Sequence, residues 1–376
     1  MRIGVPAEVF SGENRVALVP DVIPSLLQAG IEVLIQKGAG ENAHVSDGEF
    51  TTSGAIIINT VEDLWERSNM ILKVQPLSHK DPSETDLIQP GSALIGLLQP
   101  SANPDLIQIL AEKKITSFSL DMIPRIARAQ KMDALSSMAS IAGYKASLIA
   151  ANSLGKFLPM MMTAAQTVRP AKGVILGAGV AGLQAIATAR RLGAVVKAFD
   201  VREAVKEQVE SLGATFVGAS AVDREAEDAR GYAKELSSKS QELQLEIVTA
   251  LVREADFVIT TALIPGKPAP LLITEEMVRQ MQPGAVIVDI AAEAGGNCSL
   301  TQPNTKIEAH GITIHGPVNL PSSMPIHASQ MYARNLSSFL LHLLEDGELK
   351  LDFSDSITRE CCLTHDGNLM YGVADA

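Results

Sequence analysis

The chain has 376 residues, 46% of them hydrophobic and 20% charged, which excludes a disordered or collagen-like protein and favours two domains. Its 31 basic and 43 acidic side chains give a formal net charge of −12, so neither nucleic acid nor a bare anionic membrane is an expected partner. Three cysteines without a CxxC pair, and an N-terminus without signal-peptide character, indicate a soluble protein of a reducing compartment.

The first 120 residues alternate short apolar runs with amphipathic segments. Helices are expected at 21–29 and 104–113. The apolar runs predict strands at 2–5, 32–36, 56–58, 70–74, 93–97 and 115–117. Strands and helices that alternate in this way predict a mainly parallel sheet with helices on its faces.

Residues 134–168 are rich in alanine and methionine and carry few charges. The segment predicts one or two buried helices, broken near Gly155 and Pro159, that join two domains. The three methionines at 160–162 are interpreted as filler of a hydrophobic core rather than as an exposed binding surface.

A second α/β unit begins at Lys172 and runs to about residue 325. Its strands are expected at 173–176, 195–199, 215–217, 257–260, 286–289 and 312–315. A last helix over about 326–345 leads to a tail in which the sequence THDG predicts a hairpin turn.

The predicted fold is therefore α/β, with two Rossmann-like, doubly wound domains and a nucleotide in the cleft between them. The first domain is expected to cover 1–133 and to be completed by 329–376. The second is expected to cover 134–328.

A glycine motif gives the strongest local signal. Gly177, Gly179 and Gly182 form GxGxxG directly after an apolar strand and at the start of an alanine-rich helix. Gly177 permits a tight turn, Gly179 lets the backbone approach a pyrophosphate, and Gly182 lets the helix pack closely on the strand. The pyrophosphate is then expected at the free N–H groups of the helix N-terminus.

Asp200 ends the next strand, 18 residues after Gly182. A carboxylate here accepts hydrogen bonds from the adenosine ribose and repels a 2′-phosphate, which favours NAD(H) over NADP(H). Arg202 complicates this preference, since a nearby arginine tolerates the phosphate, but the carboxylate is expected to dominate.

Two further segments of the second unit are candidates. Residues 223–246 are heavily charged and contain Gly231 and Tyr232; they form either a solvated helical insertion or a mobile lid over the nucleotide. The strand that ends at Thr260 is followed by Ala262 and Leu263, whose backbone is expected at the carboxyl edge of the sheet, where ligands bind.

A polar cluster lies upstream, between a proline and the alanine-rich segment. Asp133 or Ser136 in this cluster is also suited to a plain helix cap, with the arginines solvated. The cluster contains Arg125, Arg128, Gln130, Asp133, Ser136 and Ser137.

Together, RxxRAQxMDxLSS, GAGVAG, the DVR after the second strand, RGYAKELS and DIAAEAGGN resemble the NAD(H)-binding component of proton-translocating nicotinamide nucleotide transhydrogenases. The resemblance covers nearly the whole chain. It implies hydride transfer between NADH and NADP⁺ held on a partner subunit, coupled to proton movement. It also implies a homodimer, partnered by a membrane-embedded proton-channel subunit and an NADP(H)-binding subunit, at the cytoplasmic face of a bacterial inner membrane.

The resemblance also assigns residues. Arg125, Asp133 and Ser136 would hold the nicotinamide carboxamide and ribose, and Gln130 would reach toward the incoming NADP(H). The other cofactor contacts it implies or leaves adjacent are Ser137, Ala178, Gly179, Val180, Asp200, Val201, Arg202, Gly231, Tyr232, Gln244, Ala262 and Leu263.

Alanine dehydrogenase belongs to the same wider family and supplies the main alternative. Arg15 and Lys73 match its substrate-holding residues, and Glu293 stands at its aspartate near the nicotinamide. Its proton-transfer histidine, however, is matched by Gln99, which cannot act as the general base that oxidative deamination requires. A non-enzymatic NAD(H) sensor is the second alternative.

No metal site or membrane span is expected. The seven histidines, His315 and His327 among them, and the cysteines Cys298, Cys361 and Cys362 show no metal-ligand spacing. The longest uncharged stretch, 309–333, contains three prolines.

Overall fold

The computed structural model describes residues 1–79, 83–218, 238–264 and 266–370. The chain divides into two compact units, one of residues 1–138 with 321–376 and one of residues 139–320. The domain boundaries expected from the sequence stay predictions.

The first unit is built on an eight-stranded sheet in the order β19-β18-β6-β5-β4-β1-β2-β3. Six of its strands are parallel: β1 (Arg2–Val5), β2 (Glu32–Gln36), β3 (Ile56–Ile58), β4 (Met70–Leu72), β5 (Ala93–Gly96) and β6 (Thr116–Ser119). In chain order these strands lie 3-2-1-4-5-6, the arrangement of a doubly wound fold, with a topological switch point between β1 and β4. The predicted strands are all present, with ends shifted by up to two residues.

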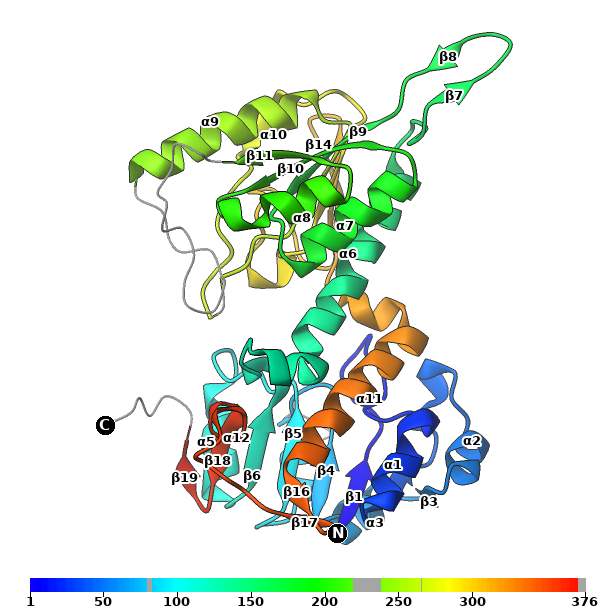
Figure 1. Cartoon of the computed structure of the whole chain (residues 1–376), viewed down its shortest axis with the longest axis vertical. Helices are drawn as coiled ribbons and strands as arrows, with labels where there is room; N and C mark the ends of the chain where they lie inside the picture. Colours follow the sequence, from blue (N-terminus) through cyan, green and yellow to red (C-terminus); the bar gives the residue numbers. More distant parts are fainter. Residues whose placement is uncertain (80–82, 219–237, 265, 371–376) are drawn as a thin grey trace. The chain divides into compact units, whose positions relative to one another are not determined.

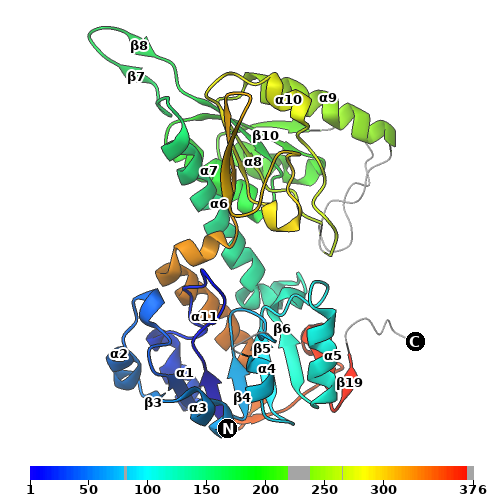
Figure 2. The same cartoon turned by 180° about the vertical axis from the view of Figure 1, so that it is seen from behind.

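The C-terminal tail extends this sheet. β18 (Cys362–His365) pairs antiparallel with β6 and turns back through Asp366 and Gly367 into β19 (Asn368–Leu369), so the predicted hairpin is confirmed. Both strands lie beside α5 (Pro104–Glu112), as Figure 2 shows.

The other helices of the first unit are α1 (Ile23–Gln28), α2 (Asp47–Thr52), α3 (Val61–Arg67), α4 (Glu84–Leu87), α11 (Pro325–His342) and α12 (Ser356–Cys361). Local sequence sets their ends: Ser46 and Glu49 form a capping box at α2, for example. α11 stops before residue 345, the end expected for its helix, because Asp346 and Gly347 take positive φ and turn the chain into the hairpin β16 (Leu344–Glu345) and β17 (Glu348–Leu349).

The second unit repeats the architecture. Its sheet order is β11-β10-β9-β12-β13-β15-β14, again 3-2-1-4-5-6 for the parallel strands, with one antiparallel edge strand. The strands are β9 (Lys172–Leu176), β10 (Val195–Asp200), β11 (Thr215–Gly218), β12 (Phe257–Thr260), β13 (Val286–Asp289), β14 (Thr305–Ala309) and β15 (Ile312–Gly316). β14, with the sequence TKIEA, is not among the predicted strands because its charges hide the alternation of a half-buried strand.

Helices of the second unit are α7 (Val180–Arg191), α8 (Lys206–Ser211), α9 (Ser238–Glu254) and α10 (Glu275–Arg279). An aliphatic core rich in valine, isoleucine and alanine lies on both faces of the sheet. The predicted α/β fold with two Rossmann-like domains is confirmed.

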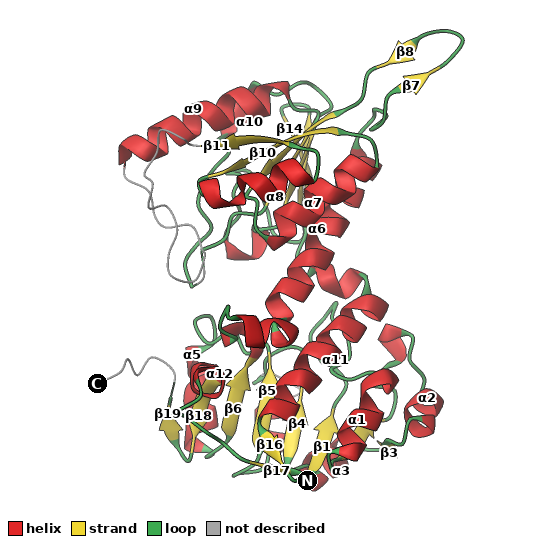
Figure 3. Ribbon diagram, viewed as in Figure 1, coloured by secondary structure: helices red, strands yellow, loops and turns green. Residues whose placement is uncertain are grey.

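The interpretation of residues 134–168 is partly wrong. α6 (Ala134–Ser153) is helical as predicted, but the chain then forms β7 (Met161–Met162) and β8 (Thr167–Val168), a hairpin that projects from its unit (Figure 3). Met160, Met161 and Met162 are 58%, 37% and 75% exposed, so they do not fill a core. Pro159 cannot continue a helix, and the hydrogen bond from Thr163 N–H to the Gln166 carbonyl closes the turn instead.

Candidate functional site

The glycine motif forms a tight turn between β9 and α7. Gly177 has a φ of +100°, and a Cβ there would lie 2.5 Å from Thr261 Oγ1. At Gly182 a Cβ would lie 1.9 Å from the Gly177 carbonyl oxygen. Both positions therefore require glycine, one for its backbone conformation and the other because helix and turn approach so closely.

Gly179 is different, because its φ of −74° suits any residue. A Cβ there would meet nothing nearer than Arg202 Nη2, at 4.0 Å. The missing side chain thus leaves open space at the N-terminus of α7, where no side chain caps the free amides. Open space beside unpaired amides fits a pyrophosphate, which such a helix end binds well.

Asp200, at the end of β10, is 5% exposed and lies against this turn. Its Oδ2 accepts a hydrogen bond from Ala178 N–H at 2.7 Å and from Arg202 Nη2 at 2.9 Å. Its Oδ1 accepts from Arg202 N–H at 2.9 Å and from Arg202 Nε at 3.0 Å. The carboxylate predicted to hold the adenosine ribose is thus joined directly to the glycine turn, and Val201 follows it, partly buried.

The loop after β12 completes the carboxyl edge of this sheet. Thr261 Oγ1 donates to the Gly177 carbonyl at 3.1 Å, which attaches the loop to the glycine turn. The backbone of Ala262, expected to face a ligand, is already paired on both sides. Its N–H donates to Asn297 Oδ1 at 3.0 Å, and its carbonyl accepts from Asn297 Nδ2 at 2.9 Å. Only the methyl group of Ala262 is left for a ligand, while Leu263 beside it is exposed.

Asp289 and Asn297 hold this edge together, and the sequence alone assigns a role to neither. Both are completely buried. Asp289 Oδ1 accepts from Thr260 Oγ1 and Ala291 N–H, at 2.8 and 3.1 Å. Its Oδ2 accepts from the N–H of Asn297 and Cys298 and from the hydroxyl of Thr301, at 2.6–3.0 Å. The segment DIAAEAGGN contains both residues, but only the folded chain shows what they bind.

The remaining residues predicted for this unit divide into two groups. Gln244 lies within α9 and is partly buried, and Val180 begins α7. Gly231 and Tyr232, with the proposed lid around them, lie outside the described residues.

The polar cluster of the first unit lies on a short 3-10 helix, η4 (Ala127–Met132), and on the start of α6. Asp133 caps α6: its Oδ1 accepts from Ser136 N–H at 2.8 Å and its Oδ2 from the Ser136 hydroxyl at 2.6 Å. The simple interpretation as a helix cap is therefore correct as geometry. Arg125 and Gln130 are exposed nearby, and Ser137 is partly buried in the first turn of α6.

Two contacts brace η4 from segments that are distant in the sequence. Arg128 forms an ion pair with Asp355 and donates to Ser356 Oγ at 3.2 Å. Asn335 of α11 donates from Nδ2 to the Lys131 carbonyl at 2.9 Å. The C-terminal part of the chain thus fixes the segment that carries Gln130.

The residues that match an amino-acid substrate site are buried in ion pairs. Arg15 binds Glu13 through two hydrogen bonds, at 2.6 and 2.7 Å, and Lys73 pairs with Glu84 and, at 3.3 Å, with Glu8. Burial alone would raise the pKa of Glu13, but the hydrogen bonds and charge of Arg15 outweigh it and lower that pKa to about 2.

Gln99 follows β5 with a φ of +48°, and its N–H donates to Asp121 Oδ2 at 2.8 Å. Burial raises the pKa of Asp121. In the second unit, Glu293 accepts a hydrogen bond from Asn319 N–H at 2.6 Å. None of these contacts turns Gln99 into a proton-transferring group, because an amide side chain does not titrate.

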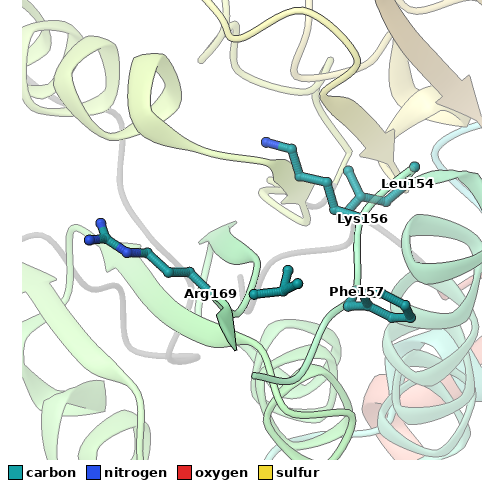
Figure 4. Close-up of a pocket in the computed structure, with 6 residues that line it drawn as sticks. Leu154, Lys156, Phe157 and Arg169 are labelled. Carbon is teal, nitrogen blue, oxygen red and sulfur yellow. The ribbon is translucent and has the colours of Figure 1, made fainter. Parts of the chain in front are cut away.

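A shallow pocket of about 420 Å³ lies at the base of the β7–β8 hairpin. Its lining is Leu154, Gly155, Lys156, Phe157, Val168 and Arg169 (Figure 4), none of which belongs to the predicted nucleotide site. Among the described residues, no cluster of three His, Cys, Asp or Glu side chains is arranged to hold a metal ion. In those same parts of the chain, no helix is both long and apolar enough to cross a bilayer.

Two family models match this sequence. The N-terminal domain of the alanine dehydrogenase/PNT family matches residues 4–142, and its C-terminal domain matches residues 146–372. Among curated proteins, an NAD(P) transhydrogenase alpha subunit of Rhodospirillum rubrum, the first of the segments into which that subunit is divided, is 45% identical over 99% of this chain and 98% of its own length. An alanine dehydrogenase of Mycolicibacterium smegmatis is 30% identical over 98% of this chain and 95% of its own.

A solved structure, the transhydrogenase from Sinorhizobium meliloti, superimposes with a TM-score of 0.85 at 38% identity and covers all of both chains. An L-alanine dehydrogenase structure superimposes with a TM-score of 0.82 at 26% identity. The resemblance inferred from the motifs is confirmed over both units, and the chain belongs to the alanine dehydrogenase/PNT family.

Proposed function

We propose that this chain is the NAD(H)-binding subunit of a proton-translocating transhydrogenase, in the reaction NADH + NADP⁺ ⇌ NAD⁺ + NADPH. The observation that carries the proposal is the 45% identity over nearly the full length of both chains to a protein named as a transhydrogenase subunit. The identity to the alanine dehydrogenase is 30% over a similar length.

The second unit would bind the adenosine half of the nucleotide. Gly177, Ala178, Gly179, Val180 and Gly182 would surround the pyrophosphate, supported by the open space at Gly179. Asp200, Val201 and Arg202 would surround the adenosine ribose, and Gly231, Tyr232, Gln244, Ala262 and Leu263 the rest of the nucleotide. For Ala262 this contact would be made by its methyl group, since Asn297 holds its backbone.

The first unit would bind the nicotinamide half. Arg125, Asp133, Ser136 and Ser137 would hold the carboxamide and ribose, while Gln130 would reach toward NADP(H) on the partner. Asp133 and Ser136 already hold each other at the start of α6, so their positions are set before any nucleotide binds.

Gln99 supports hydride transfer between two nucleotides rather than amino-acid oxidation. Transfer between nicotinamide rings moves no proton at the reacting carbons, so it needs positioning and not a general base. Oxidative deamination requires such a base, and a glutamine at this position cannot supply one.

The relatives named as subunits imply partner subunits. We propose that these are a membrane-embedded proton-channel subunit and an NADP(H)-binding subunit, with this chain at the cytoplasmic face of a bacterial inner membrane. NADP(H) would be carried by the partner and NAD(H) by this chain.

We further propose a homodimer in which a second copy covers the β7–β8 hairpin. Phe157 and the methionines at 160–162 are exposed on this hairpin and beside the pocket at its base, and exposed apolar surface of this kind marks protein contacts. Met162→Asp is expected to yield monomers in analytical ultracentrifugation. Leu271→Asp, which places the same charge at an exposed leucine away from the hairpin, is expected to leave dimers; dimers in both variants would exclude the hairpin.

One experiment tests the proposed reaction. The purified chain is mixed with NADH and an NADP⁺-loaded partner component and, separately, with NAD⁺ and alanine, and nicotinamide absorbance is followed. NADH oxidation that depends on the partner supports the proposal. NAD⁺ reduction by alanine alone would indicate an amino-acid dehydrogenase, and nucleotide binding with neither reaction would indicate a sensor.

Gln130 provides a residue-level test. Gln130→Asn shortens the side chain that would face NADP(H), so it should slow hydride transfer far more than it weakens NADH binding. If the variant lost transfer and binding to the same extent, Gln130 would simply hold the nucleotide.

A further inference from the structure

The Asp200 carboxylate has every acceptor position filled by the protein itself. A carboxylate offers about four lone-pair sites on its two oxygens. Ala178 N–H, Arg202 N–H, Arg202 Nε and Arg202 Nη2 occupy them, with donor–acceptor distances between 2.7 and 3.0 Å. The two hydroxyls of a ribose therefore find no free acceptor on Asp200.

Two of these donors belong to the backbone and two to a side chain. Ala178 N–H is part of the glycine turn, and Arg202 N–H lies two residues beyond Asp200, so both are fixed by the fold. Nε and Nη2 lie at the end of the long Arg202 side chain, which has several rotatable bonds. The guanidinium is thus the group that can leave without disturbing the turn.

The position of the guanidinium matches the same conclusion. Arg202 Nη2 lies 4.0 Å from the place that a Cβ of Gly179 would occupy, at the open N-terminus of α7. The pair is also well shielded, since the Arg202 side chain is 13% and the Asp200 side chain 5% exposed. Such a pair is not a loosely held surface salt bridge.

We infer that the Arg202 side chain is an internal stand-in for the adenosine ribose. It fills two acceptor positions of Asp200 while the site is free and leaves them when ribose hydroxyls arrive. The inference rests on the NAD(H) site proposed above. It makes Arg202 a competitor of the nucleotide for Asp200 and not a ligand that only adds affinity.

The same exchange affects nucleotide choice. A 2′-phosphate approaching Asp200 meets the negative carboxylate, and the positive guanidinium of Arg202 offsets that repulsion. Arg202 is thus expected to weaken NADH binding, by competition, and to soften the exclusion of NADPH. Removing it should widen the difference between the two nucleotides.

Isothermal titration calorimetry with ADP-ribose, NADH and NADPH tests the inference on the whole chain. Arg202→Ala frees two acceptors, so ADP-ribose and NADH should bind about tenfold tighter, the factor that corresponds to 1.4 kcal/mol. NADPH should not tighten. Arg202→Met, which retains the apolar part of the side chain, should behave like Arg202→Ala and serves if the alanine variant does not fold.

Lys206→Ala is the matched control, because it removes the same charge from an exposed residue that pairs with Glu203 and not with Asp200. Its affinities should equal those of the wild type. Weaker or unchanged NADH binding in both Arg202 variants would overturn the inference, as would equal tightening of NADH and NADPH. Failure of the wild type to bind NADH or ADP-ribose would instead refute the proposed function.

Discussion

Asn297→Ala tests whether the carboxyl edge of the second sheet depends on one buried amide. The Asn297 side chain makes three hydrogen bonds, with the N–H and carbonyl of Ala262 and with the Pro270 carbonyl, at 2.8–3.0 Å. Truncation would leave these three backbone groups without that partner at a position that is completely buried.

The cost follows from these contacts. Each buried polar group that loses its partner costs about 1–3 kcal/mol, and relaxation of the loop recovers part of the total. We therefore expect Asn297→Ala to lower the unfolding free energy by about 3–5 kcal/mol, which is large for one substitution. Since Thr261 joins this loop to the Gly177 carbonyl, the folded variant should also bind NADH more weakly.

Urea unfolding followed by circular dichroism measures the first effect, and calorimetric titration of NADH measures the second. Asn152→Ala, at an exposed position in α6, is the control and should change the unfolding free energy by no more than about 0.5 kcal/mol. If Asn297→Ala were as stable as the control, Asn297 would not organise this edge.

Three further substitutions test other parts of the structure. Gly182→Ala places a Cβ 1.9 Å from the Gly177 carbonyl oxygen, so calorimetry should show NADH affinity falling at least as far as stability does; full affinity would exclude this turn as the pyrophosphate site. Glu13 has its pKa lowered from 4.5 to about 2 in the folded chain, so its stabilisation, on the order of 3 kcal/mol, is present above pH 4.5 and disappears as the pH falls toward 2. The difference in unfolding free energy between wild type and Glu13→Gln should therefore narrow over this range, and a constant difference would contradict the ion pair with Arg15. Arg128→Ala removes the contact of η4 with Asp355; we expect slower hydride transfer with nearly unchanged NADH affinity, whereas equal loss of both would show that the contact serves nucleotide binding.

The elements that the sequence predicts best are those with a local cause. Six-stranded doubly wound sheets follow from apolar runs alternating with helices, and the turn at Gly177 follows from the glycine spacing, because only glycine suits its φ and its close contacts. The hairpin at Asp366 and Gly367 is likewise predictable from its turn residues.

The features that the sequence does not reveal depend on contacts far apart in the chain. Asn297 acts on Ala262, 35 residues away, and Arg128 pairs with Asp355, 227 residues away. The assignment of the methionines at 160–162 to a core is wrong because their apolar character does not distinguish a buried helix from a projecting hairpin. Arg202 stands beside Asp200 in the sequence, but its occupation of both carboxylate oxygens is visible only in three dimensions.

The most direct test of the account follows an isotope. NADH deuterated at the transferring C4 position is mixed with this chain and the NADP⁺-loaded partner, and the reduced product is analysed by mass spectrometry. A hydride that passes from ring to ring, with no acid–base group between, delivers the deuterium intact to NADPH. Loss of the label to water during turnover would contradict direct transfer and the role assigned to this protein.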